Sequence, residues 1–141
     1  MASIMIEAWR TSLTGQVHSL PALDAAYGPA VRLHLLDAYG WQLLACQRVV
    51  QTPSSPPHAA RELPKLAPGI AMSPEVREMA LLEEGSWLTE LMAPIAPGLS
   101  VRRPKNVLAV SSSQFDVVKA EDIYRKLEAL IDRFADAIDE S

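Results

Sequence analysis

Hydrophobic residues near the N-terminus recur every three or four positions. They are Ile6, Trp9, Leu13, Val17 and Leu20. This spacing places them on one face of an amphipathic helix, which Pro21 should stop. A second stripe of the same period lies near the C-terminus, at Ile123, Leu127, Leu130, Ile131, Phe134 and Ile138. The pattern predicts a helix near each end of the chain, the second one spanning about residues 117–138.

The segment that begins near Ala30 follows a shorter period. Val31, Leu33 and Leu35 alternate with Arg32 and His34, as inward and outward residues do along a half-buried strand. Residues 37–40 carry a turn signal, and residues 41–50 resemble a returning strand. A first β-hairpin is therefore predicted over residues 30–50.

A second hairpin is predicted further along the chain. Two apolar-rich runs, residues 76–82 and 87–93, flank a glycine-bearing turn at residues 83–85, which is typical of paired strands. Residues 106–110 resemble one more strand. The predicted fold is α+β, with an antiparallel sheet and helices packed on one face.

Proline is concentrated between the two predicted hairpins. The five prolines of residues 51–69 have no backbone N–H to donate to a sheet, so this segment is predicted to be a loop or flap with at most a short helical piece. Loops of this length in a compact domain are usually mobile or functional. With 141 residues, the chain fits a single domain over 1–141.

Composition excludes several classes of partner and site. A net charge of -4 and a pI near 5.3 argue against a nucleic-acid surface. No apolar run reaches the ~18 residues of a membrane span, and the N-terminus does not resemble a secretory signal. The lone Cys46 excludes a disulfide framework and favours a reducing, cytoplasmic location. Three widely separated histidines and the lack of glycine-rich phosphate motifs predict no metal and no cofactor.

The second predicted hairpin carries two charged residues, Arg77 and Glu90, among apolar neighbours such as Met79. A two-residue turn would bring Arg77 and Glu90 to the same side as diagonal neighbours, whereas a three-residue turn would place Glu90 on the other face. On one face they could bind a small carboxylate and supply an acid or base. The alternative is a salt bridge at the rim worth ~0 to 1 kcal/mol.

Three segments together resemble the chorismate pyruvate-lyase family over about residues 1–95. They are W-R-T-S-L-T from Trp9, V-R-L-H-L-L-D-A-Y-G-W ending at Trp41, and E-V-R-E-M-A-L-L-E-E-G ending at Gly85. The same pattern is similar to the ligand-binding domain of GntR-type regulators. The resemblance implies an antiparallel sheet with a flap-covered pocket, and cofactor-free elimination of pyruvate from chorismate to give 4-hydroxybenzoate.

The resemblance also implies roles for individual residues. Arg77 matches the arginine that holds a substrate carboxylate, and Leu13 falls at the apolar flap position. Independently of the resemblance, period-two alternation places Met79 on the same strand face as Arg77, where it is predicted to contact the substrate. Glu90, in T-E-L-M-A-P, resembles the catalytic glutamate, although its segment comes earlier in the chain than in the family. The alternatives are a non-catalytic domain that binds a small aromatic or carboxylate ligand, and an interaction module whose C-terminal helix docks on a partner or on a second copy.

Overall fold

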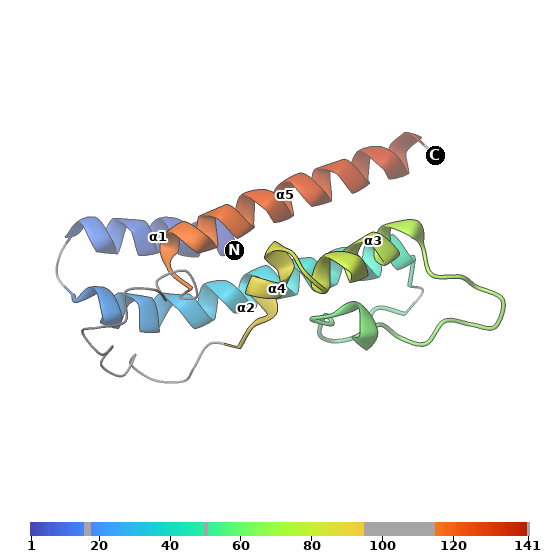
Figure 1. The fold of residues 1–141 in the computed structure, drawn as a ribbon, viewed down its shortest axis with the longest axis horizontal. Coiled ribbons are helices and arrows are strands. Elements are labelled where there is room, and N and C mark those ends of the chain that lie inside the picture. The colour runs from blue at the N-terminus through green and yellow to red at the C-terminus, as the bar shows by residue number, and fades with distance from the viewer. Residues whose placement is uncertain (16–17, 50, 95–114, 141) are drawn as a thin grey trace.

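The computed structural model describes residues 1–15, 18–49, 51–94 and 115–140, and within these ranges it contains helices and no strand. The elements, shown in Figure 1, are α1 (Ala2–Gly15), α2 (Leu20–Gln47), the short 3-10 helix η1 (Ala60–Glu62), α3 (Pro74–Glu83), α4 (Trp87–Met92) and α5 (Val117–Glu140). The predicted α+β fold with an antiparallel sheet is therefore wrong, and the described protein is a helical bundle. The strand predicted at 106–110 lies outside the described residues.

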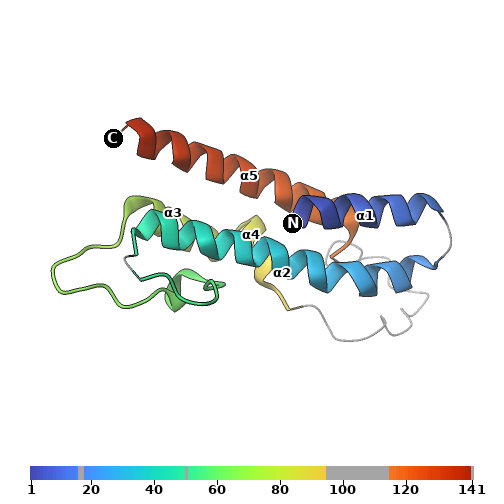
Figure 2. The same cartoon turned by 180° about the vertical axis from the view of Figure 1, so that it is seen from behind.

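The long helix α2 is the centre of the bundle. It contacts α1, α3, α4 and α5, and both ribbon views show α1 and α5 along the same side of it (Figures 1 and 2). Its inner face supplies much of the core, including the fully buried Val31, Leu35, Tyr39 and Leu43. Trp9 of α1 is also fully buried, with its ring 6.0 Å from that of Tyr27 and 6.5 Å from that of Phe115. One apolar core thus joins the first and last helices to α2.

The hairpin predicted over residues 30–50 is wrong because α2 continues without a break to Gln47. Ser19 caps the helix N-terminus by accepting a hydrogen bond from the Ala22 N–H at 3.4 Å, and Pro21 lies in the first turn, where its missing N–H costs nothing. Pro21 therefore begins a helix, whereas α1 already ends at Gly15. The segment is rich in Leu, Ala and Gln, which favour helix over strand.

The second predicted hairpin is also wrong, since α3 and α4 occupy it. Ser73 caps α3 by accepting from the Val76 N–H at 3.2 Å, and Pro74 follows at the first helical position. Ser86 and Thr89 form a reciprocal capping box that starts α4. Each serine supplies an acceptor for backbone N–H groups that a helix N-terminus leaves without a partner. These two caps stabilise helices in the apolar runs that had been predicted to be strands.

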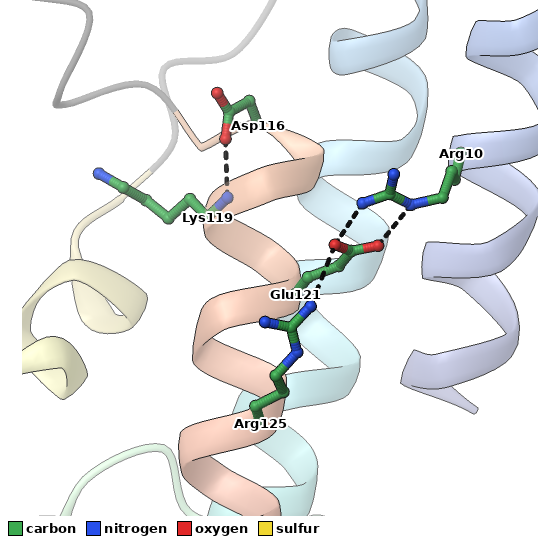
Figure 3. Close-up of polar contacts among 5 residues, drawn as sticks. All are labelled: Arg10, Asp116, Lys119, Glu121 and Arg125. Carbon is green, nitrogen blue, oxygen red and sulfur yellow. Dashed lines mark hydrogen bonds and ion pairs between the residues drawn. The ribbon is translucent and has the colours of Figure 1, made fainter.

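The apolar stripe of α5 covers the bundle, and polar contacts hold the helix in place. Leu127 is only 2% exposed, and Ile123, Leu130 and Phe134 are buried beside it. At the N-terminal end the Glu121 carboxylate accepts hydrogen bonds from the Arg10 guanidinium of α1 and lies near Arg125 (Figure 3). The hydrogen bonds from Arg10 hold the pKa of Glu121 below its usual value. The stripe therefore packs on its own chain.

Candidate interaction surface on helix α2

Helix α2 has few polar residues on any side. Its 28 residues include only three charged side chains, Asp24, Arg32 and Asp37. A helix that is apolar all round is normally buried on all sides, whereas a surface helix keeps a polar face toward water. In this bundle, however, one side of α2 keeps large apolar side chains partly exposed to solvent.

We define the outer face of α2 as the residues Ala30, Leu33, His34, Asp37, Ala38, Trp41 and Ala45. Leu33 is 48% exposed and Trp41 is 42% exposed. Ala45 is exposed, and the other four are half-buried. Each member lies three or four residues from at least one other member, so they share one side of the helix. The outer face is a mostly apolar strip with one imidazole and one carboxylate near its middle.

One edge of the outer face is formed by the proline-rich segment. Gly40 meets this segment so closely that an added Cβ would lie 1.8 Å from the Pro57 carbonyl oxygen and 2.9 Å from Pro56 Cβ. The His58 Nε2 atom lies 2.8 Å from Asp37 Oδ1. The segment predicted to be a flap is therefore docked on α2 at residues 56–58.

A second set of contacts fixes the same segment to α3. Glu83 Oε1 accepts hydrogen bonds from the Tyr39 hydroxyl at 2.5 Å and from the Ala60 N–H at 2.8 Å. Burial and the adjacent Glu83 carboxylate raise the pKa of Tyr39, so the phenol stays protonated and donates. Three elements, α2, α3 and η1, meet at this carboxylate.

A shallow hollow opens beside Glu83. It has a volume of about 390 Å³ and is lined by Ala60, Arg61, Met72, Ala80, Glu83, Glu84 and Met92. Two carboxylates and one guanidinium share its wall with two thioethers. The Glu83 side chain is already used by Tyr39 and Ala60, which indicates a structural role for this carboxylate.

Arg32 connects α2 to the end of α4. Its guanidinium donates to the backbone carbonyl oxygens of Leu91 and Met92, both at 2.9 Å. These carbonyls lie at the end of α4, where backbone acceptors have no partner within the helix. Burial lowers the pKa of Arg32. The only arginine of α2 is thus committed to holding α4.

The four residues that sequence reasoning assigned to a substrate site lie on three different helices. Arg77 is exposed on α3, and Met79 of the same helix is fully buried in the core. Leu13 is half-buried on α1. Glu90 is exposed in the first turn of α4, with its carboxylate 3.8 Å from the Lys119 amine. None of the four lines the hollow.

The lyase activity implied by the resemblance has no support from the helical fold. The resemblance implied a sheet with a covered cavity, and the described ranges contain no strand. Comparisons with protein-family models, with curated proteins and with solved structures found no match for the chain. Within the residues that the structure describes, no group of three or more His, Cys, Asp or Glu could hold a metal ion, and none of the helices has the length and apolarity to cross a bilayer.

The outer face of α2 is not among the predicted sites because residues 30–50 were expected to form strands. The signal that could have found it is the scarcity of charge across residues 20–47. A run of this length is too long for a strand of a small sheet and fits a central helix. Which side of that helix stays exposed depends on the packing of four other helices, and the local pattern does not encode it.

Proposed function

We propose that the protein is a protein-interaction module that binds a helix of its partner against the outer face of α2. The observation that carries the proposal is the exposure of Leu33 and Trp41, 48% and 42%, on a helix that is apolar all round. Binding a partner there would remove the exposed apolar parts of both side chains from water, which is favourable. Tryptophan is enriched among the residues that dominate binding energy.

The size of the apolar surface fits a modest interaction. Covering the exposed parts of Leu33 and Trp41 would remove about 200 Å² of apolar surface from water, worth about 5 kcal/mol before the costs of association. The spacing of the outer face matches the ridges with which one helix packs on another. An amphipathic helix is therefore the partner element that fits this surface.

The stripe of α5 is a less suitable docking surface. Leu127 and Leu130 are buried against the protein's own core, so binding a partner through them would require α5 to leave the bundle. The outer face of α2 needs no such rearrangement. The proposal therefore keeps the expectation of an interaction module and moves its binding surface from the last helix to the central one.

The proposal includes a reducing, cytoplasmic setting. Cys46 is a free thiol, and burial raises its pKa, which keeps it in the unreactive thiol form. A lone buried thiol is typical of chains that fold where disulfides do not form.

Site-specific photo-crosslinking tests the proposed function. A photoreactive phenylalanine analogue is placed at position 41 or, as a matched control, at position 81. Leu81 is 68% exposed on α3 and is not part of the outer face. We expect a crosslinked protein product at position 41 that the additional change Leu33→Lys abolishes. Equal products at both positions, or no product at position 41, would contradict the proposal.

A further inference from the structure

The outer face of α2 is complementary to itself. We propose that its partner is a second copy of this chain, with the two α2 helices packed antiparallel across a twofold axis that passes between positions 35 and 36. This inference rests on the proposed function, because it names the partner of the same surface. A closed twofold pair uses the same patch on both subunits, so each patch must contain the complement of its own residues.

The spacing along the middle of the outer face provides that match. Ala30, His34, Asp37 and Trp41 follow one another at steps of four, three and four residues, which is the repeat that keeps one seam facing a partner helix. In an antiparallel pair about this axis, Trp41 of one copy lies at the level of Ala30 of the other. His34 lies at the level of Asp37, and the reverse pairs follow by symmetry.

Size and charge agree with this register. The largest side chain of the face meets one of the smallest, so the indole can pack over the alanine of the other copy while the helices approach closely. Flanking residues repeat the pattern, since Leu33 comes to the level of Ala38. An imidazole comes to the level of a carboxylate at the other central position. His58 of the same chain contacts Asp37 through Oδ1, which leaves the second carboxylate oxygen for His34 of the other copy.

The composition of the outer face favours a second copy of the chain over a strongly charged partner. Asp37 is its only carboxylate, and it contains no lysine or arginine. A strongly basic or acidic partner would gain no electrostatic steering from so weakly charged a face. A second copy does not depend on such steering. The face is small compared with standard interfaces, so a dissociation constant in the range of about 1–100 µM is expected.

Sedimentation analysis of the full chain from about 1 to 500 µM, a range set by that affinity, tests the proposal. We expect a monomer–dimer equilibrium that Trp41→Lys and Leu33→Lys each shift toward monomer by at least about tenfold in dissociation constant, since each places a charge in the seam. Leu81→Lys makes the same exchange at an exposed leucine of α3 and should leave the equilibrium unchanged. Circular dichroism checks that every variant keeps its helices.

Crosslinking tests the register. Two single substitutions, Ala30→Cys and Trp41→Cys, are made in separate chains and oxidised alone or mixed. Two copies of position 41 lie about 16 Å apart along the helices, since eleven residues separate the levels of positions 30 and 41, and a disulfide needs Cα atoms within about 7 Å. The mixture should therefore form a disulfide-linked heterodimer, and neither variant alone should do so.

Three results would overturn the inference. They are a monomer at all concentrations, a dimer that Trp41→Lys and Leu33→Lys leave intact, and a disulfide that forms as well in the unmixed variants. The proposed function can hold even where the dimer inference fails. If the chain is monomeric and position 41 still crosslinks to a different protein in a Leu33-dependent manner, the surface binds another partner. If position 41 crosslinks to nothing, both ideas are wrong.

Discussion

Replacing Gly40 by alanine would test how the proline-rich segment is fixed to α2. The new Cβ would lie 1.8 Å from the Pro57 carbonyl oxygen and 3.0 Å from its carbonyl carbon, and backbone atoms at these distances must move. The segment at 56–60 would then have to lift from the helix. Its contacts to Asp37 and Glu83 would be lost or weakened.

The expected loss can be worked out from those contacts. The hydrogen bond from the Ala60 N–H to the Glu83 carboxylate is worth about 1.5–3 kcal/mol because its acceptor is charged, and the half-exposed contact of His58 with Asp37 adds about 0–1 kcal/mol. Exposing the buried Ala59 and Ala60 side chains costs about 0.8 kcal/mol each. Alanine gains about 1 kcal/mol of helix propensity over glycine. The net destabilisation should be about 2–4.5 kcal/mol.

Gly28→Ala in the same helix is the matched control. An added Cβ there would meet its nearest atom, the Phe115 carbonyl oxygen, at 3.6 Å, an ordinary contact. This variant should keep the gain in helix propensity and be as stable as the parent or up to about 1 kcal/mol more stable. The same substitution in one helix is thus expected to have opposite effects at two positions.

Urea and thermal unfolding measure both variants. The expected loss corresponds to a decrease in Tm of about 7–15 °C for Gly40→Ala. Trypsin cleavage after Arg61 and Lys65 should also become faster in that variant, because a lifted segment is accessible. If Gly40→Ala were as stable as Gly28→Ala and cleaved no faster than the parent, the segment would not pack on α2 as described.

Four further substitutions, one of them a control, test other parts of the bundle by urea unfolding. Leu127→Glu should abolish cooperative unfolding, because it buries a charge at a position that is 2% exposed, whereas Ala129→Glu at an exposed position of α5 should change stability by less than about 0.5 kcal/mol. Arg32→Met should cost about 1–3 kcal/mol by leaving the carbonyls at the end of α4 without their donor, and an unchanged midpoint would contradict that role. The raised pKa of Tyr39 means that its contribution to stability is fully present below the unfolded-state pKa near 10 and falls as pH rises above it. Tyr39→Phe should therefore flatten the loss of stability between about pH 10 and 11 relative to the parent chain.

Some elements of the fold follow from the sequence because their pattern has one interpretation. The stripes of α1 and α5 repeat every three or four residues, and only a helix places such residues on one face. The proline-rich run has too few backbone donors for a sheet. The actual form of residues 56–60 on α2 could not be predicted, because it depends on Gly40, His58 and Glu83, which lie far apart in the sequence.

The central helix and the pair α3 and α4 show where local pattern fails. Val31, Leu33 and Leu35 alternate as in a strand, yet alternation over a few residues also occurs within a helix that is apolar on every side. Ser73 and Ser86 marked helix starts, but glycine at position 85 also suits a hairpin turn. Here the helix caps and the packing of neighbouring elements decided between the two.

The sequence by itself determined that the chain would bury an apolar core, that its first and last amphipathic segments would be helical, and that charge would be scarce along residues 20–47. Tertiary structure decided which side of that apolar helix remained exposed. The physical reason is that an apolar side chain makes burial favourable whichever surface covers it. The covering surface is supplied by elements distant in the chain. Leu33 and Leu35 have the same side chain, but only Leu35 is covered by the bundle.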